Sequence, residues 1–399
     1  SAAVAMAGLW STSLLCSIDA AHTYYLAGRK HTLRAIVGTG LFWSLVLGVL
    51  ATPLYLLVAP LIRGQKASAL DTVLGLSTFL VPFLVLKAFV LSVFLGENKI
   101  DRYNLLQVGS NLCLLVLLAA LLLVPAPTVR SAVWAQLVSL VVFVLAGAVW
   151  VAREVRRRPE SGPWISRRLL REGFVYGIQG HVGVFFAQFT YRFDQLLVTR
   201  MAGLEAQGYY SIATALAEKL TLISSSVHLV LFPRISASTR EEANRLTPMA
   251  VRMTLLLVVL AAIVLWFAGG LLVRIFYSSA FDPVLPAFRV LLPGIVVLSL
   301  SRLLSGDLSG RAERLPQTAA LGSAFLLNLG LDLLWIPRHG MVGAAWASTL
   351  AYAWQTGFLL VVFWRASGVS PRELLVPRWD DLRRVRDAVR AVQQGRRVA

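Results

Sequence analysis

About eleven long apolar segments run through this chain, and they limit it to very few folds. Backbone N–H and C=O groups in hydrocarbon cannot bond to water, so a spanning segment must satisfy them within a helix or a closed barrel. Each segment has roughly 20 residues or more, which is the length of an α-helix that crosses a bilayer. We therefore expect an all-α polytopic membrane protein with helices in the ranges 3–28, 35–62, 70–96, 104–125, 131–152, 173–199, 206–232, 248–276, 284–306, 315–337 and 340–364.

The composition agrees with this assignment. The chain has 399 residues, of which 57% are hydrophobic and 15% are charged, whereas soluble domains carry about 25% charged residues. The net charge of +18 would suit a nucleic-acid-binding protein, but the basic residues alternate from loop to loop and form no single cluster. We therefore expect no nucleic-acid partner. The two cysteines, Cys16 and Cys113, lie in separate apolar segments, which argues against a disulfide or a metal site.

The alternation of basic loops predicts the orientation of the chain in the membrane. Loops on the cytoplasmic side carry an excess of Lys and Arg. One set of loops is rich in them, at 29–34, 99–102, 153–171, 234–245 and 311–314 and in the tail after Trp364. The opposite set holds only Arg63, Lys66, Arg130, Arg200, Arg274 and Arg338. We expect a multi-pass protein of the cytoplasmic (inner) membrane with a cytoplasmic C-terminus.

The charge pattern also divides the chain into two lobes. We expect an N-terminal lobe of five spans at 1–153, a basic cytoplasmic linker at 154–172, a C-terminal lobe of six spans at 173–365 and a basic cytoplasmic tail at 366–399. Two six-helix lobes, the first lacking its first helix, account for this arrangement most simply. Many transporters consist of two such repeats with the substrate site between them near the bilayer midplane.

Two neighbouring segments of the second lobe carry polar stripes. At about 100° per residue, the segment 173–199 places five polar residues within an arc of roughly 60°, with Asp194 on nearly the opposite side. The next segment, 206–232, places six polar residues within an arc of about 100°, with Lys219 beside them. The first stripe consists of His181, Gln188, Arg192, Gln195 and Thr199, and the second of Ser211, Thr214, Glu218, Thr221, Ser225 and His228.

Full-length polar stripes do not face lipid, so they face each other or a water-filled cavity. A network of hydrogen bonds between helices would explain the hydroxyl groups. It would not require the ionised groups, so we favour a substrate cavity. Asp19, with His22 nearby, Asp194 and Glu218 are candidates for Na⁺ or H⁺ coupling, although His22 could equally belong to a capped helix end. Arg302 either reaches a phosphate or extends to the membrane interface.

Several segments resemble the multidrug/oligosaccharidyl-lipid/polysaccharide exporter superfamily, particularly its bacterial oligosaccharide flippases of the O-antigen type. The resemblance rests on YRFDQLLVTRMAGLEAQGYYSIATALAEKL at 191–220, VLFPRIS at 230–236, LLNLGLDLLWIPRHGMVGAAWASTLAY at 326–352 and LGENKIDRYNLL at 95–106. It implies twelve or more helices, of which the first is missing here, and two lobes that alternate in access. We interpret Asn328 and Asp332 as packing and end-capping residues, and the small residues from Gly343 to Ser348 as a close-packing face.

The resemblance implies a flippase that moves an undecaprenyl-diphosphate-linked oligosaccharide across the membrane for surface polysaccharides such as lipopolysaccharide. Arg192 and Lys219 would hold the diphosphate, and Gln188, Thr214 and Ser225 would bind the sugar. The expected partners are the bilayer, the lipid-linked glycan and, in the same process, a polymerase and glycosyltransferases. Alternatives are a cation-coupled multidrug exporter and a flippase for peptidoglycan precursors. A membrane glycosyltransferase or polymerase is disfavoured by the short external loops, and no catalytic motif or cofactor is expected.

Reporter fusions test the predicted topology. Fusions after Arg34, Arg102, Arg158, Arg240 and Arg314 should report the cytoplasm, because these sites lie in the basic loops. Fusions near Lys66, Arg130, Gly203, Ser279 and Arg338 should report the external side. A pair of neighbouring loops with the opposite signals would contradict the two-lobe arrangement.

Overall fold

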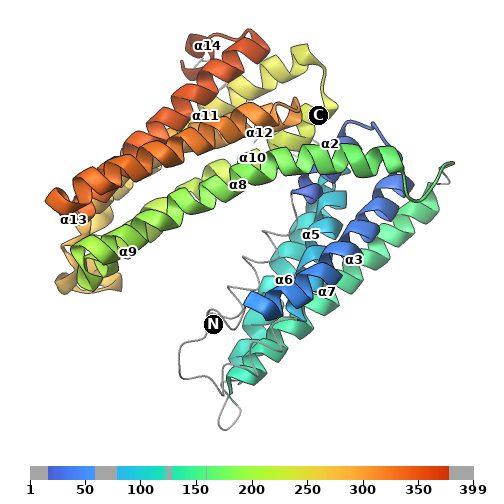
Figure 1. The fold of residues 1–399 in the computed structure, drawn as a ribbon, viewed down its shortest axis with the longest axis horizontal. Helices are drawn as coiled ribbons and strands as arrows, with labels where there is room; N and C mark the ends of the chain where they lie inside the picture. The colour runs from blue at the N-terminus through green and yellow to red at the C-terminus, as the bar shows by residue number, and fades with distance from the viewer. Residues whose placement is uncertain (1–16, 59–78, 122, 124–127, 159, 377–399) are drawn as a thin grey trace, which may run out of the picture. The chain divides into compact units, whose positions relative to one another are not determined.

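The computed structural model describes residues 17–58, 79–121, 123, 128–158 and 160–376 (Figure 1). Within these ranges the elements are α-helices and one short 3-10 helix, without a strand, so the predicted all-α class is confirmed. Every apolar segment expected from the sequence overlaps a helix. Those in the first half are α2 (Ile18–Ala27), α3 (Leu33–Val58), α5 (Leu80–Gly96), α6 (Ile100–Leu121) and α7 (Val129–Arg157).

The second half begins with α8 (Arg167–Ala202), followed by α9 (Leu204–Glu218), α10 (Thr221–Ala237), α11 (Arg240–Phe276), η2 (Ser279–Phe281), α12 (Val284–Gly310), α13 (Arg314–Ser367) and α14 (Pro371–Leu375). Among the described helices, six are long and apolar enough to cross a membrane, and seven are if the bent pair α9 and α10 forms one span. Helix α5 is apolar but shorter.

Two compact units make up the chain, residues 1–181 and 182–399, and the boundary lies inside α8. The sequence places the division earlier, at the basic segment 154–172. In the structure this segment packs on unit 1. The Glu172 carboxylate lies 3.1 Å from Nε2 of His31, and a Cβ at Gly38 would come within 2.0 Å of the carbonyl oxygen of Trp164. The assignment of two transport lobes remains a prediction.

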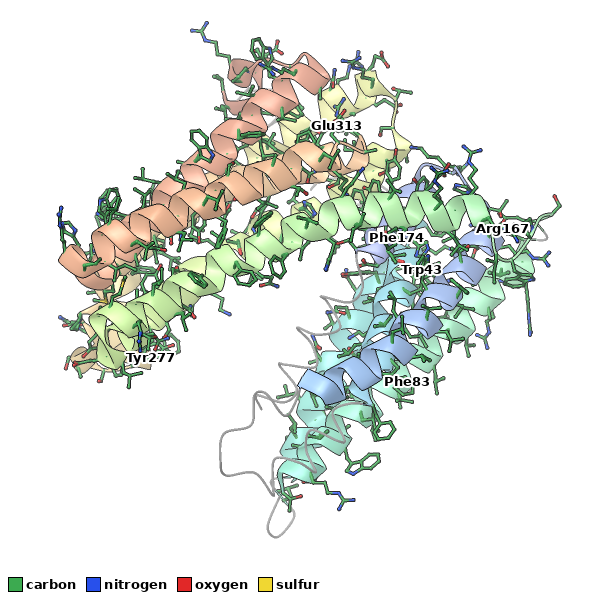
Figure 2. All side chains as sticks on the ribbon, viewed as in Figure 1. Trp43, Phe83, Arg167, Phe174, Tyr277 and Glu313 are labelled. Atoms are coloured by element: carbon green, nitrogen blue, oxygen red, sulfur yellow. The ribbon has the colours of Figure 1, made fainter. Side chains whose placement is uncertain are left out.

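Helix α5 is the centre of unit 1 and contacts α2, α3, α6 and α7. Helix α5 is buried along much of its length, and the ring of its Phe89 lies where a Cβ at Gly40 of α3 would be, so α3 needs glycine at this contact. Aromatic side chains join α8 to the same unit. Trp43 stacks on Phe174 with ring centroids 5.9 Å apart (Figure 2), and Tyr24 stacks on Tyr176 at 4.8 Å.

Helix α12 is the central helix of unit 2 and contacts α9, α10, α11 and α13. Most of its side chains are buried, including Phe288, Leu292 and Ile295. Close approach to α13 depends on small residues, since a Cβ at Gly294 would lie 2.6 Å from the Thr349 hydroxyl oxygen. The small residues from Gly343 to Ser348 are buried except Trp346, in agreement with a close-packing face.

Two deviations from regular helix shape unit 2. Helix α13 has 54 residues, but Gly340 has φ 56° and ψ −139°, so two helices meet there, as the sequence predicts. A positive φ favours glycine, and Pro337 precedes this break.

Helices α9 and α10 meet at a bend of 46°. Four backbone hydrogen bonds at this bend, the first from Lys219 N to Leu216 O and the last from Ile223 N to Leu220 O, span three residues instead of four and tighten the turn.

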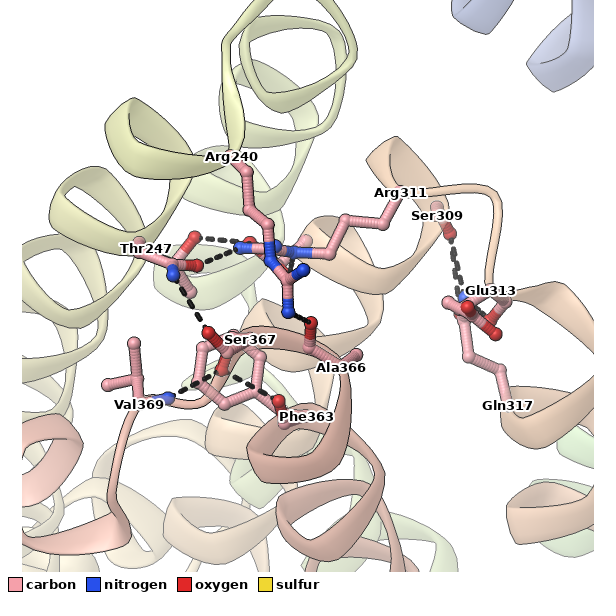
Figure 3. Close-up of polar contacts among 12 residues, drawn as sticks. Arg240, Thr247, Ser309, Arg311, Glu313, Gln317, Phe363, Ala366, Ser367 and Val369 are labelled. Atoms are coloured by element: carbon pink, nitrogen blue, oxygen red, sulfur yellow. Dashed lines mark hydrogen bonds and ion pairs between the residues drawn. The ribbon is translucent and has the colours of Figure 1, made fainter.

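A hydrogen-bonded cluster around Asp307 ties the ends of α11, α12 and α13 together (Figure 3). The carboxylate of Asp307, which is fully buried, accepts hydrogen bonds from the Thr247 hydroxyl at 2.6 Å and from the Arg311 guanidinium at 2.6 and 3.2 Å. Arg311 also donates to Asn244 at 2.7 Å, and Asn244 donates to the carbonyl oxygen of Ser367 at 2.8 Å. Each charged group in this cluster therefore has a partner.

Removal of the central carboxylate should destabilise unit 2. Asp307→Ala leaves the Arg311 side chain, which is 13% exposed, without its counter-ion, and loss of one partner of a buried pair costs about 3–5 kcal/mol. The free energy of unfolding in detergent measures this effect. Asp282→Ala is the control, because Asp282 also pairs with an arginine, Arg274, but at an exposed site. The bond from Arg274 lowers the pKa of the Asp282 carboxyl group, and loss of an exposed pair costs little. Equal stability of the two variants would contradict the proposed role of the cluster.

Candidate functional site

A buried carboxylate, Asp194 of α8, is the centre of the main polar cluster in unit 2. Its side chain is 3% exposed. The Tyr210 hydroxyl of α9 donates to Oδ2 at 2.6 Å, and the Ser348 hydroxyl of α13 donates to the same oxygen at 3.3 Å. Oδ1 accepts the backbone N–H of Gln195 at 2.6 Å. Three helices thus converge on one carboxylate.

A second buried carboxylate, Asp332 of α13, lies within electrostatic range of Asp194. Its Oδ2 accepts a hydrogen bond from Nδ2 of Asn328 at 2.7 Å. Among the described residues, Oδ1 of Asp332 and Oδ1 of Asn328 have no hydrogen-bond partner. Both residues are buried, in agreement with the predicted packing role, but the predicted end-capping role is wrong, because they lie inside α13, eight or more residues before its break at Gly340.

The arrangement of the two carboxylates limits their chemistry. Within the described part of the chain, neither Asp194 nor Asp332 forms a salt bridge with Lys, Arg or His. A buried carboxylate without a counter-ion is costly, so it takes up a proton or a cation. The described residues contain no group of three or more His, Cys, Asp or Glu side chains with metal-site geometry.

Two of the residues predicted to line the cavity meet between α8 and α9. Nε2 of Gln195 lies 3.4 Å from the Thr214 hydroxyl oxygen. Thr214 is buried, and its hydroxyl also donates to the backbone of α9. Glu218 ends α9 within electrostatic range of Asp194. The expected single stripe over 206–232 is interrupted, because α9 and α10 are separate helices and Lys219 is exposed at their bend.

Arg302 of α12 forms a second polar contact, with α10. Its Nη1 donates to the Ser225 hydroxyl at 3.3 Å, and its carbonyl oxygen lies 2.8 Å from Nδ1 of His228. Among the described residues Nε of Arg302 is buried without a partner, and no carboxylate pairs with this guanidinium. Arg302 is therefore a half-buried cation whose hydrogen-bonding capacity is only partly used.

The other predicted residues lie elsewhere. Gln188 is exposed on α8, and the side chain of Arg192 lies outside the described part of the structure. His181 is the last residue of unit 1. Asp19 and His22 also belong to unit 1, where they line a small cavity of about 10 Å³ with Trp43 and Ser44. His22 is 2% exposed and contacts the edge of the Phe89 ring at 5.4 Å.

Sequence analysis missed three groups of this site. Tyr210 was not singled out, and Ser348 was assigned only to the close-packing face, because tyrosine and serine are common in apolar helices and their partner lies on another helix. Asp332 was interpreted as a packing and end-capping residue. A charged residue inside an apolar span is by default a functional candidate, and this signal would have identified it. An aromatic run close in sequence to Asp194 was also missed: Phe185, Phe186, Phe189 and Phe193 of α8, with Phe325 of α13.

Comparison with known proteins places the chain in a family and a fold. A family model described as a polysaccharide biosynthesis protein matches residues 29–286, more than half of the chain. A candidate O-antigen transporter of Shigella flexneri is 21% identical over 289 residues, which are 71% of this chain and 68% of that protein. An uncharacterized membrane protein of Methanocaldococcus jannaschii is 23% identical over 250 residues, 61% of this chain and 48% of that protein. The chain thus spans about half the length of this relative.

Solved structures share the fold at low sequence identity. A multidrug-resistance transporter of the MATE family, in the MOP superfamily, has a TM-score of 0.77 and 14% identity, covering 91% of this chain and 86% of the other. A MOP-superfamily transporter of Pyrococcus furiosus, described as having a binding pocket of reversed polarity, has a TM-score of 0.77 and 16% identity, with the same coverage. The exporter superfamily predicted from the sequence is confirmed.

Two adjacent tyrosines test the importance of the Asp194 cluster. Tyr210→Phe removes the 2.6 Å bond to the buried carboxylate of Asp194 and should lower the free energy of unfolding by about 1.5–3 kcal/mol, the usual value for a bond to a charged group. Tyr209→Phe is the matched control, because it removes a 2.9 Å bond from the neighbouring tyrosine to Glu205 at an exposed site. Denaturation in detergent compares the two variants. Equal effects would show that the bond from Tyr210 to the buried Asp194 carboxylate stabilises the fold no more than the exposed bond from Tyr209.

Proposed function

We propose, because the chain belongs to the polysaccharide biosynthesis protein family, that it is a membrane transporter for a polyprenyl-diphosphate-linked oligosaccharide. The family match over 29–286 and the fold of MOP-superfamily transporters support a membrane transporter rather than an enzyme. The observation that favours an anionic substrate is Arg302, a half-buried guanidinium without a carboxylate partner among the described residues. The exported glycan would contribute to surface polysaccharide.

The substrate class follows from the chemistry of the available groups. A diphosphate needs cations and hydrogen-bond donors, and a guanidinium binds phosphate oxygens in pairs. Arg302 can offer its remaining N–H groups, while Ser225 beside it offers a hydroxyl for phosphate or sugar oxygens. Arg192 and Lys219 stay candidates for the same role, and Gln188 and Thr214 stay candidates for the sugar. Transport would use alternating access, with the substrate stabilising one of two conformations.

In this proposal the coupling ion binds at the Asp194 cluster. Two buried carboxylates within electrostatic range of each other repel unless one of them binds a proton or a cation. Binding of H⁺ or Na⁺ would therefore change the contacts of Tyr210 and Ser348, which join α8, α9 and α13. Asp19 in unit 1 remains a further candidate for coupling. The proposed location is the cytoplasmic membrane, with the C-terminus inside.

A second candidate function is a cation-coupled multidrug exporter. The aromatic run of α8 with Phe325, close in sequence to Asp194, favours it, because aromatic faces attract organic cations. Solved structures with the same fold include multidrug transporters of the MATE family. Glu218, which lies near Asp194, would add negative charge to such a site.

Surface display of polysaccharide separates the two functions. In cells that lack their own copy, Arg302→Gln should reduce display by about tenfold or more, since loss of a charged hydrogen-bonding group costs that much in binding. Arg302→Lys should recover only part, because Lys lacks the planar fork. Arg289→Gln is the matched control, as Arg289 is exposed on the same helix. All variants are compared at equal abundance in the membrane.

The same cells report the alternative. A multidrug exporter should tolerate Arg302→Gln but become unable to protect cells against cationic dyes when Asp194→Asn removes the negative charge. A lipid-diphosphate transporter should leave dye sensitivity unchanged in both variants. Normal polysaccharide display by Arg302→Gln would remove the main support for the diphosphate substrate.

A further inference from the structure

Unit 1 contains a cavity of about 610 Å³ that the proposed transport site does not use. Helices α3, α5 and α7 form its walls, and the segment before α8 borders its mouth. The walls are apolar, with Val37, Leu41, Leu86, Phe89, Val90 and Val151 among the lining residues. The mouth is polar and contains Arg34, Arg156, Arg158, Glu160 and Trp164. Its volume lies within the range of about 300–1,000 Å³ that is usual for ligand sites.

The cavity runs from helix ends towards the interior of the bilayer. Arg34 lies at the start of α3 and Arg156 at the end of α7, so the basic mouth is at the membrane interface. Leu41 lies seven residues further along α3, which corresponds to about 10 Å at 1.5 Å per residue. This is a large part of one hydrocarbon leaflet, which is about 15 Å thick. Both Leu41 and Ala152 are exposed at the edge of the cavity, so it is accessible from outside the unit.

The charges at the mouth are only partly satisfied. Arg34 lies over the ring of Trp164 at 4.8 Å, and its Nη1 is 3.4 Å from the Glu160 carbonyl oxygen. Its Nε is buried and, among the described residues, has no partner. Arg156 is exposed and forms no ion pair with any described residue. Glu160, the one acid among the described residues that line the cavity, accepts the backbone N–H of Arg34 at 3.2 Å. Arg158 pairs with Glu97 at 2.6 Å.

The shape of the mouth is held by close packing. The carbonyl group of Trp164 occupies the space where any side chain at Gly38 would lie. Trp164 therefore stays over α3, and its ring keeps the guanidinium of Arg34 in place. A fixed cation above an apolar wall suits a ligand that has both an anionic head and a hydrocarbon chain.

We propose that this groove binds one anionic phospholipid of the cytoplasmic leaflet. The phosphate would lie between Arg34 and Arg156, and one acyl chain would lie along Val37, Leu41 and Phe89. A soluble anion would gain nothing from the apolar wall, and a zwitterionic lipid, whose own cation offsets its phosphate, would gain less from the arginines, so the combination favours an anionic lipid. The site belongs to unit 1 alone and does not depend on the nature of the transported substrate.

Native mass spectrometry of the purified full chain tests this site. Phosphatidylglycerol and phosphatidylcholine with identical acyl chains are added separately, and the retained lipid is counted. The wild type should retain one phosphatidylglycerol in preference to phosphatidylcholine. Arg34→Gln with Arg156→Gln should weaken its retention by about tenfold to thirtyfold, as expected for the loss of two basic residues near a phosphate.

Two further variants make the result specific. The double variant Arg153→Gln with Arg157→Gln removes the same amount of charge from exposed positions of α7 that do not line the cavity. It should leave lipid retention unchanged. Ala152→Trp keeps every charge but fills the groove, and it should displace the lipid. This variant also covers the case in which the double substitution at Arg34 and Arg156 prevents folding.

Several outcomes would overturn the proposal. Equal loss in both arginine pairs would indicate diffuse attraction to the basic surface, and equal retention of the two lipids would indicate an apolar groove without head-group recognition. Retention of a polyprenyl phosphate in place of phosphatidylglycerol, lost only in the groove variants, would assign the groove to the carrier lipid of the transported glycan.

Discussion

Hydrocarbon offers no hydrogen-bond partner, so every polar group at membrane depth has to find one inside the protein or be costly. This constraint explains the helices themselves, because a helix satisfies its own backbone. It also explains the internal contacts of both units. In unit 1 the amine of Lys87 on α5 donates to the Ser110 hydroxyl of α6 at 2.7 Å, and Ser139 of α7 donates to the Ser110 carbonyl oxygen at 2.6 Å. In unit 2 the same requirement gathers partners around Asp307 and Asp194.

These two aspartates show two different ways in which a buried carboxylate meets this constraint. The Asp307 carboxylate is bonded to Arg311 and Thr247, and the attraction of opposite charges holds three helix ends together. Asp194 accepts hydrogen bonds from neutral groups of the described residues, and another carboxylate, Asp332, lies within electrostatic range of it. A closed ion pair has little reason to change during a transport cycle. In the proposed function, the Asp194 and Asp332 carboxylates, which form no ion pair with a described residue, exchange a proton or an ion, and Arg302 accepts an anionic group.

The family and the fold leave room for such differences. Solved transporters of the MOP superfamily share the fold at 14–16% identity, and the fold itself does not determine the substrate. What is transported depends on the few polar and aromatic groups that line the path. Unit 2 of this chain contains both a half-buried cation, Arg302, and a pair of buried carboxylates, Asp194 and Asp332, and the proposed function therefore assigns substrate and coupling ion to different places.

The sequence by itself determined the all-α class, the position of nearly every helix and the family, because span length and apolar periodicity are local properties. It also predicted the break between 337 and 340, since Pro337 and Gly340 are local signals. The bend at Glu218 was missed, as no Gly or Pro marks it. Tertiary structure alone decided that Asp194 meets Tyr210 and Ser348, and that Arg302 meets Ser225. These pairs lie up to 154 residues apart, and their contacts depend on helix packing, which no single helix specifies.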